Sequence, residues 1–239
     1  MIFNDNTEIF SENDVTALRH SNVYFDSKRG EYFICAYINR NEAWQNLRPE
    51  LISSSGSFEN YYGLVQKEKE SFKKVLTVLR AEKSARQFYN SYFKAHAVCP
   101  QKIAEFNSID KKIQKAETEF LPLKKSFVMY IDSTGDENES VKAKISEIFS
   151  LHGFVIADKG SYKISVKNKI QITQENEIYL SSPESEIFIT DKNGTALFSC
   201  TSRVNKAAAY TKESAQRISL NKLLNKIEED LKGFLSGEY

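Results

Sequence analysis

The first half of the chain combines one dense apolar strand pattern with long stretches of helical periodicity. The run from Gly30 to Trp44 reads GEYFICAYINRNEAW and is the richest cluster of aromatic and β-branched residues in this half. Such side chains favour strands. Because positions on both sides of the alternation are apolar, the run predicts a strand whose two faces are both covered.

A β-hairpin is predicted around this strand. Residues 23–25 and 31–39 have strand character, and the turn-forming residues 26–30 between them give a loop of four or five residues. Residues 1–20 carry apolar side chains only at wide intervals, which suits a short helix or an edge element.

Helical periodicity is predicted to begin after a serine-rich segment. Pro49 and the serines of residues 53–57 indicate the end of the N-terminal section. Apolar residues then recur at spacings of three and four from Phe58 to Leu79, and the stripe continues more weakly to Phe93. The pattern predicts one long helix.

A second helix follows an interruption at Cys99 and Pro100. The residue before a proline is disfavoured in the α region, and proline suits the start of a helix. Apolar residues then return at alternating spacings of three and four, as expected of a helix packed along a neighbour. They are Phe106, Ile109, Ile113, Ala116 and Phe120. We expect an antiparallel helical hairpin with its turn near residues 96–100.

The segment around Pro122 predicts the end of that helix and a domain boundary, giving an N-terminal domain of residues 1–121 and a C-terminal domain of residues 122–239. The second domain has the element order β-α-β-β-β-β-α, which predicts one antiparallel or mixed sheet with helices on one face. The predicted fold class is therefore α+β: an N-terminal β-hairpin with a long antiparallel helical hairpin, followed by this sheet domain.

One turn in the second domain predicts a register. Asn193-Gly194 favours a type I′ turn, in which both central residues have positive φ. If these two residues form the turn, Ile187 lies opposite Cys200 and Ile189 lies opposite Phe198, all on one face. Cys200 is then part of the core.

Composition describes an ordinary globular chain. The 239 residues are 41% hydrophobic and 27% charged with a net charge of +1, which argues against a disordered chain and against a strongly basic nucleic-acid-binding protein. The three cysteines are far apart and predict neither a disulfide framework nor a zinc site. No apolar run approaches the about 18 residues of a membrane span, and the polar, acidic N-terminus is unlike a secretory signal.

The common catalytic motifs are absent from the sequence. It contains no Gly-rich phosphate loop, no pair of histidines at helical spacing and no Gly-x-Ser-x-Gly. His20, His96 and His152 lie in separate predicted elements, and a histidine at a helix C-terminus, as predicted for His152, is explained by the helix dipole. We therefore predict no catalytic residue, no cofactor and no metal ligand.

An acidic loop, residues 132–139, leaves one alternative open. Asp132, Asp136, Glu137 and Glu139 follow a predicted strand, where α/β proteins often place a metal-binding or catalytic carboxylate, but their spacing is not that of a calcium loop. We favour a solvated loop in which Asp136 caps the next helix and Glu139 completes a capping box. The alternative is a metal-dependent hydrolase.

A candidate interaction surface lies at the end of the predicted strand. Tyr37, Arg40, Glu42 and Trp44 include the residue types that dominate binding hot spots. The alternative is an intramolecular clamp, in which Trp44 packs on the long helix and Arg40 pairs with Glu42 or a helix carboxylate. The lysines of strand 162–172 could contact phosphates, although polar residues on the solvated side of a sheet are the ordinary expectation.

The opening run resembles a phrase of bacterial cell-envelope lipoproteins. The phrase has the form aromatic-aromatic-x-x-Ala-Tyr-Ile-x-Arg-x-x-Ala and is similar to that of the small twenty-kilodalton surface lipoprotein family and of flagellar outer-ring accessory proteins. It is carried here by Tyr32, Phe33, Ala36, Tyr37, Ile38, Arg40 and Ala43. The strand, Asp-x-x-Gly, strand and helix of residues 191–235 also resemble that group. The chain departs from the pattern because it shows no lipoprotein signal and no lipobox cysteine.

The resemblance implies a periplasmic or outer-membrane-associated protein that is not an enzyme and has a structural or assembly role. It implies an envelope protein as partner, no nucleic acid, and membrane contact only through a removed lipid anchor; it leaves the oligomeric state open. Two rival hypotheses remain. One is a small-molecule or peptide binder with its pocket between the two predicted domains, and the other is the hydrolase that uses residues 132–139.

Overall fold

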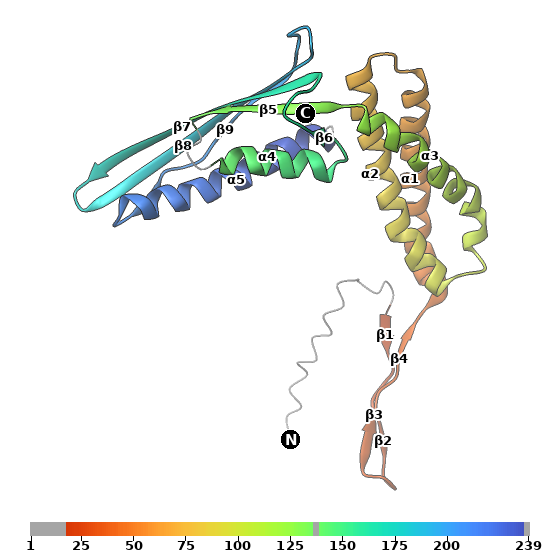
Figure 1. Ribbon diagram of the computed structural model, residues 1–239. Coiled ribbons are helices and arrows are strands. Elements are labelled where there is room, and N and C mark those ends of the chain that lie inside the picture. Colours follow the sequence, from red (N-terminus) through yellow and green to blue (C-terminus); the bar gives the residue numbers. More distant parts are fainter. Residues whose placement is uncertain (1–17, 136–138, 237–239) are drawn as a thin grey trace. The chain divides into compact units, whose positions relative to one another are not determined.

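The computed structural model describes residues 18–135 and 139–236 (Figure 1). It confirms a mixed fold with an N-terminal hairpin, long helices and a C-terminal sheet with helices. The chain forms two compact units, one of Met1–Ser57 with Ser84–Lys111 and one of Phe58–Lys83 with Lys112–Tyr239. The boundary between residues 121 and 122 stays a prediction, and the expectation for residues 1–17 lies outside the described residues.

The first unit contains the predicted β-hairpin. Its strands are β1 (Leu18–His20), β2 (Tyr24–Asp26), β3 (Glu31–Phe33) and β4 (Ala36–Ile38). β2 pairs with β3 and β1 pairs with β4, both antiparallel. The loop of residues 27–30 closes at Gly30, whose φ of 68° is a conformation that glycine adopts without strain. The predicted hairpin and its loop are confirmed.

A bulge separates the two pairs of strands. Residues 21–23 of one strand lie opposite residues 34–35 of the other. Ser21 holds the irregular stretch together, because its N–H donates to the Cys35 carbonyl over 2.7 Å and its hydroxyl accepts from the Cys35 N–H over 2.9 Å. Bulges of this kind increase the local twist of a strand pair.

The predicted burial of the hairpin strand on both faces is wrong for the described chain. In the described residues the two arms of the hairpin, β1 with β2 and β3 with β4, pair only with each other, and large apolar side chains on both arms stay open to solvent. Those that are exposed are Leu18, Val23, Tyr24, Phe25, Tyr32, Phe33, Ile34 and Tyr37.

The long helix begins earlier than predicted. α1 (Arg40–Lys67) contains both Pro49 and the serine-rich segment that were expected to precede the helix. A buried seam with helical spacing runs through the whole of α1, and this packing holds the helix together despite the proline. The seam consists of Ala43, Leu47, Leu51, Ser54, Phe58 and Val65. Ser54 and Ser55 donate their hydroxyl protons to carbonyls one turn earlier, at Glu50 and Ile52.

The predicted single helix is in fact two helices. α2 (Ser71–Val98) follows α1 after a short turn at residues 68–70. The sequence pattern did not show this turn, because Val65 and Phe72 are seven residues apart, which is two helical turns, and the apolar spacing therefore continues across it. The predicted interruption at Cys99 and Pro100 is confirmed. A 3-10 turn η1 (Ile103–Phe106) then leads into α3 (Asn107–Lys125), which carries Pro122 inside it and so ends three residues after that proline.

The second unit contains a six-stranded mixed sheet. Its strands are β5 (Val128–Thr134), β6 (Val155–Ile156), β7 (Tyr162–Glu175), β8 (Ile178–Thr190), β9 (Ala196–Arg203) and β10 (Ala207–Ala209). The order is β10-β8-β7-β5-β6, and β9 also pairs with β8. β5 is parallel to β6 and β7, and the other pairs are antiparallel. Short β10 is the one strand added to the predicted order.

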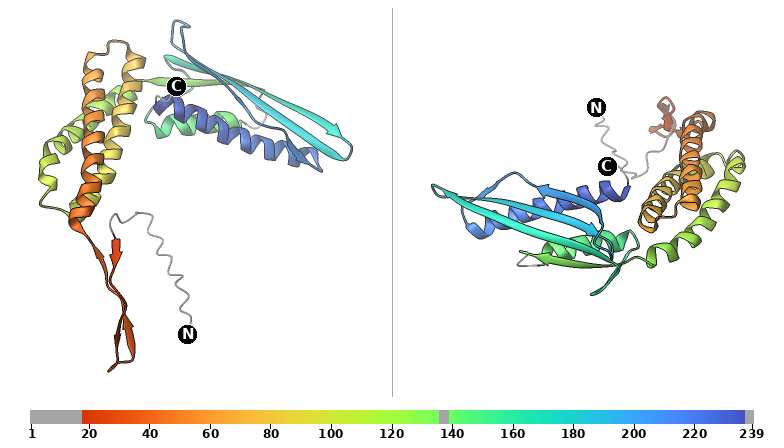
Figure 2. Two further views of the ribbon diagram at one scale, coloured as in Figure 1. Left: turned by 180° about the vertical axis from the view of Figure 1, so that it is seen from behind. Right: turned by 90° about the horizontal axis from the view of Figure 1, so that it is seen from above.

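Two helices cover one face of this sheet, as predicted. α4 (Ser140–Leu151) and α5 (Lys212–Ser236) lie on the same side in all views (Figure 1, Figure 2). The core between sheet and helices includes Met129, Ile145, Phe149, Ile164, Ile187, Ile189, Leu223, Ile227 and Leu231.

The strands on either side of Asn193-Gly194 have the predicted register, but the turn between them is not of the predicted type. Gly194 N–H donates to the Asp191 carbonyl, and of the two expected residues only Gly194 has a positive φ. Five residues, 191–195, therefore separate β8 from β9, and the turn is not type I′. A bulge between Ile189 and Thr190 then shifts the register back, so that Ile187 still pairs with Cys200 and Ile189 with Phe198. Cys200 packs against the core, as predicted.

Acid should selectively weaken the link between α4 and α5. Glu228 in α5 pairs with Lys144 of α4 at 2.6 Å and also with Lys232. Their ammonium groups lower the pKa of Glu228 from 4.5 to about 2, with the hydrogen bond from Lys144 as the largest cause. Because the folded-state pKa is depressed, the stabilising contribution is present above pH 4.5 and is lost as the pH falls towards 2.

The test compares the wild type with Glu228→Gln by urea unfolding across this pH range. We expect the wild type to be slightly more stable at neutral pH and the difference to vanish near pH 2. A difference that stays constant with pH would show that the pair does not form in solution.

Candidate interaction surface

The four predicted surface residues lie where the hairpin joins the first helix. Tyr37 is in β4, and α1 begins at Arg40 because Asn39 caps it. The Asn39 side-chain oxygen accepts from the N–H groups of Asn41 and Glu42, each over 3.2 Å. A strand therefore changes directly into a helix at this point.

Tyr37 and Arg40 line the same cleft. It has a volume of about 370 Å³ and is bounded by the base of the hairpin on one side and the end of α2 on the other. The remaining lining residues are Leu18, Ala36, Ile38, Ala97 and Val98. Tyr37 is 48% exposed, and Arg40 is exposed at the end of the same strand. The cleft is thus an open, mainly apolar surface with one cation beside it.

Glu42 and Trp44 make contacts within the unit instead. One carboxylate oxygen of Glu42 accepts from two nitrogens of Arg19, Nε at 3.0 Å and Nη2 at 2.6 Å, and this pairing raises the pKa of Arg19. Trp44 is half-buried and packs edge-on against Phe106, with their ring centroids 6.5 Å apart. The ammonium of Lys102 lies 5.8 Å from the centre of the Trp44 ring.

Further hydrogen bonds fix the start of α1 to the end of α2. Cys99 donates its thiol proton to the Arg40 carbonyl over 3.2 Å, and Lys102 donates to the Asn41 side chain over 3.1 Å. Because Cys99 is buried and engaged in this contact, it has a structural role here. These contacts tie the start of α1, where Arg40 lies beside the cleft, to the residues that follow α2.

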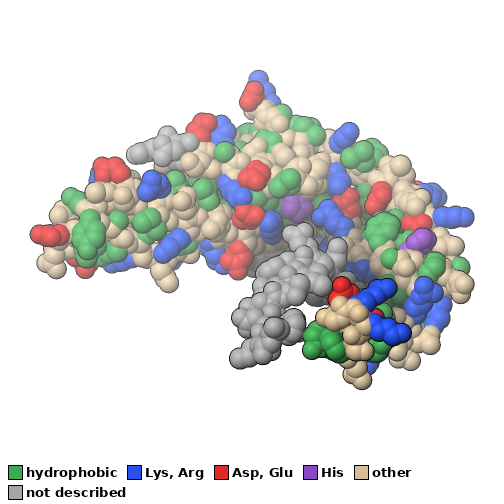
Figure 3. All heavy atoms as spheres, turned by 90° about the horizontal axis from the view of Figure 1, so that it is seen from below, with side chains coloured by type: hydrophobic (Ala, Val, Ile, Leu, Met, Phe, Trp, Pro, Cys, Tyr) green, Lys and Arg blue, Asp and Glu red, His purple; other side chains and the backbone are tan. Residues whose placement is uncertain are grey.

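Sequence reasoning missed the outer part of the hairpin as a surface. Phe25 and Tyr32 are in contact on one face, with their ring centroids 4.7 Å apart, and Tyr24 pairs with Phe33 on the other. Seen from below, hydrophobic side chains lie open on the projecting hairpin next to basic and acidic ones (Figure 3). The sequence signal for this surface was the presence of apolar residues on both faces of the strand, which was interpreted as burial within the chain.

The acidic loop gives no sign of a metal site in its described part. Asp132 forms an ion pair with Lys163 at 2.6 Å, which raises the pKa of Lys163. The predicted capping box is wrong, because the N-cap of α4 is Glu139, in the left-handed region with a φ of 54° and without a side-chain cap. Asp136 and Glu137 lie outside the described residues. Among those that are described, no three His, Cys, Asp or Glu side chains gather as metal ligands.

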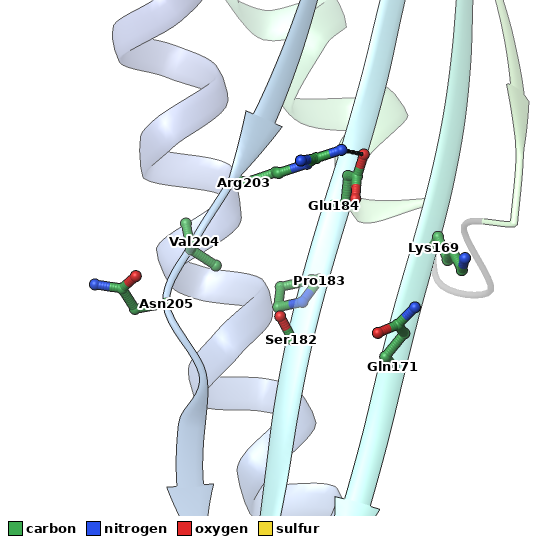
Figure 4. A pocket seen from close by; sticks show the side chains of 8 residues that line it. All are labelled: Lys169, Gln171, Ser182, Pro183, Glu184, Arg203, Val204 and Asn205. Carbon is green, nitrogen blue, oxygen red and sulfur yellow. Dashed lines mark hydrogen bonds and ion pairs between the residues drawn. The ribbon is translucent and has the colours of Figure 1, made fainter.

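The lysines of β7 face carboxylates on the open side of the sheet. Lys167 lies opposite Glu186, and Lys169 lies opposite Glu184, which also binds Arg203 at 2.7 Å (Figure 4). This charge balance makes the surface a poor match for a row of phosphates.

A shallow notch lies on this face between β9 and β10. It has a volume of about 280 Å³ and lies beside Ser182 and Pro183 of β8, with Arg203 and Asn205 at its edge (Figure 4). Pro183 has no N–H to donate, and the pairing of β8 with β9 and β10 is interrupted there while its pairing with β7 continues.

The described chain is thus an α+β protein that exposes an aromatic hairpin beside an apolar cleft. None of its described helices is long and apolar enough to cross a membrane. No family model matches the sequence, and no curated protein matches it.

Solved structures of bacterial lipoproteins show partial similarity. A minor lipoprotein from Acinetobacter baumannii has a TM-score of 0.34 and 11% identity, covering 47% of this chain and 95% of that one. Lipoprotein GNA1162 from Neisseria meningitidis has a TM-score of 0.32 and 8% identity, covering 43% and 97%. An uncharacterised lipoprotein B from Nitrosomonas europaea has a TM-score of 0.29 and 14% identity, covering 46% and 81%. These proteins belong to the broad class that the sequence phrase resembles, and similarity at this level carries no argument about function.

Proposed function

We propose that this chain is a non-enzymatic protein of the bacterial cell envelope with a role in assembly, and that the hairpin with the adjoining cleft is its protein-binding surface. Leu18 and Tyr37 belong both to the exposed apolar side chains of the hairpin and to the lining of the cleft. The resemblance of the phrase at residues 32–43 to envelope lipoproteins is the reason for the proposed location.

The observation that carries the proposal is the exposure of the hairpin. Val23, Tyr24, Tyr32 and Ile34 are each 60% exposed or more, although apolar residues occupy both faces of the strands. A two-stranded hairpin is at best marginally stable by itself, and a contiguous exposed apolar patch marks an interaction site. A protein partner would cover these side chains and stabilise the hairpin.

Site-specific photo-crosslinking tests the proposal. A photoreactive phenylalanine analogue at Tyr37 is expected to capture an envelope protein in cells, to be identified by mass spectrometry. The double variant Tyr24→Thr and Ile34→Thr should abolish this product, because it removes two exposed apolar side chains while threonine keeps the strand preference.

Tyr210 provides the matched control, since it is an aromatic residue that is 80% exposed in the other unit. The same analogue at Tyr210 should capture nothing. Equal capture at both positions, or capture at Tyr37 that survives the double threonine variant, would place the binding surface elsewhere.

A further inference from the structure

We infer that the partner inserts an apolar side chain into the cleft between the hairpin and α2 and places a carboxylate on Arg40. This inference rests on the proposed function of the cleft as part of a protein-binding surface, and it adds the chemistry of the segment that binds there. The occupant is a segment of another protein in which an apolar residue lies next to an aspartate or a glutamate.

The walls of the cleft favour an apolar side chain. Leu18 of β1 lies opposite Ile38 of β4, and Ala36 shares the face of Ile38 because strand residues two apart lie on one face. Ala97 and Val98, at the end of α2, form the other wall. Ala97 is exposed, and its small side chain leaves the volume of about 370 Å³ open. A space of this size with aliphatic walls suits an aliphatic or aromatic side chain.

Arg40 determines which charge the partner carries. It is exposed, and among the described residues that line the cleft it is the one with a charge. It forms no ion pair within the described part of the chain, and the carboxylate of Glu42 already accepts from Arg19 at 2.6 and 3.0 Å. Arg40 is also the first residue of α1, where the helix dipole favours an anion. Because a guanidinium holds a carboxylate by two parallel hydrogen bonds, the matching group on the partner is a carboxylate.

The hairpin beside the cleft favours a polypeptide as the occupant. Leu18 and Tyr37 line the cleft and also belong to the exposed apolar side chains of the hairpin. Further exposed apolar side chains lie along the same two arms, among them Val23, Tyr24 and Ile34. A protein segment fills the cleft while the rest of the partner covers these side chains, whereas a single fatty-acid chain fills only the cleft.

Fluorescence polarisation with a labelled synthetic peptide tests the charge. The probe, called the Glu peptide, is Gly-Ser-Glu-Phe-Leu-Glu-Ser-Gly, so that either chain direction brings a carboxylate to Arg40. Its twin, the Lys peptide, has lysine at both glutamate positions. The wild type should bind the Glu peptide about tenfold more tightly than the Lys peptide, and Arg40→Glu should reverse this preference, because it replaces an attraction by a repulsion.

Arg86 provides the matched control for this exchange. It is also an exposed arginine in a helix of the same unit, but it does not line the cleft. Arg86→Glu should leave the affinities for both peptides unchanged. If the wild type does not bind the Glu peptide, or if Arg40→Glu and Arg86→Glu alter the preference equally, the inference is overturned.

Filling the cleft tests the apolar part of the inference. Ala97→Phe adds a ring at the α2 wall, and because Ala97 is exposed, the change does not disturb the buried core. We expect it to weaken binding of the Glu peptide about tenfold while the circular dichroism spectrum and the Tm stay those of the wild type. Unchanged binding would mean that the peptide is held by charge alone, and it would overturn the inference.

Two other occupants of the cleft give different results. Displacement of the Glu peptide by an equimolar amount of palmitate would identify a fatty acid as the occupant. A crosslink from the analogue at Tyr37 to residues 1–17 of the same chain would show that the chain fills its own cleft. Either result overturns the inference.

The inference and the proposed function fail in distinguishable ways. If the analogue at Tyr37 captures an envelope protein in cells and Arg40→Glu and Ala97→Phe leave this product unchanged, the inference is wrong and the proposed function stands. If the peptides behave as expected but Tyr37 captures no protein in cells, the chemistry of the cleft stands and the proposed function is wrong.

Discussion

Replacing Phe149 by alanine is expected to lower the free energy of unfolding by about 3–5 kcal/mol. Phe149 lies in α4 and is fully buried against the sheet, with its ring centroid 5.5 Å from that of Phe154. Truncation removes the transfer free energy of the ring and leaves a cavity that the surrounding side chains fill only in part. Urea unfolding followed by circular dichroism measures the effect.

Leu151 is the matched control for this prediction, because it lies in the same helix but is 71% exposed. Leu151→Ala should change the stability by no more than about 0.5 kcal/mol. If the two variants unfold at similar urea concentrations, α4 does not cover the sheet with the face described here.

The sequence predicted the second unit well because its elements follow simple periods. Strand alternation, a helix with a clear apolar face and the Asn193-Gly194 turn sufficed for the order of the elements along the chain and for the pairing of Ile187 with Cys200. That pairing was correct although the turn type was not, because a longer loop and a bulge shift the register in opposite directions. The burial pattern of the two strands, and not the turn alone, determines which residues face each other.

The helices were predicted less well because their packing uses small and polar residues. Ser54 and Ser55 are buried in α1, where their hydroxyls bond to carbonyls of the preceding turn. A serine cluster next to Pro49 has the composition of a loop. Because the prediction followed this composition, it placed the start of the helix too late. Ala43 and Leu47 already followed the helical spacing, so a pattern that counts small residues would have placed the start correctly.

The candidate surface could be located from the sequence but not resolved into roles. The residue types of Tyr37, Arg40, Glu42 and Trp44 indicated the region, whereas their partners depend on contacts between distant segments. Glu42 binds Arg19, and Trp44 packs against Phe106 at the end of η1. Such pairings are separated by tens of residues and leave no periodic signal. The apolar residues on both faces of the hairpin did indicate that these faces become buried. We propose that another polypeptide, and not the rest of this chain, buries them.

Buried serines between the sheet and α5 lead to the second large effect. Ser202 in β9 donates to a carboxylate oxygen of the buried Asp230 over 2.7 Å. Ser202→Ala is expected to lower the free energy of unfolding by about 1.5–3 kcal/mol, because a hydrogen bond to a charged group is lost. The measurement is again urea unfolding at neutral pH.

Ser185 in β8 should respond in the opposite direction. Its side chain is as inaccessible as that of Ser202, but its hydroxyl has no hydrogen-bond partner among the described residues. Ser185→Ala should therefore raise the free energy of unfolding by about 1 kcal/mol, because it removes a buried polar group that is not satisfied. The two substitutions remove a hydroxyl oxygen from equally buried sites. Any difference between their effects on the free energy of unfolding therefore reflects the hydrogen bond from Ser202 to Asp230. If Ser185→Ala destabilises the protein as much as Ser202→Ala does, the hydroxyl of Ser185 is satisfied in solution; if Ser202→Ala does not destabilise it, Asp230 does not depend on Ser202.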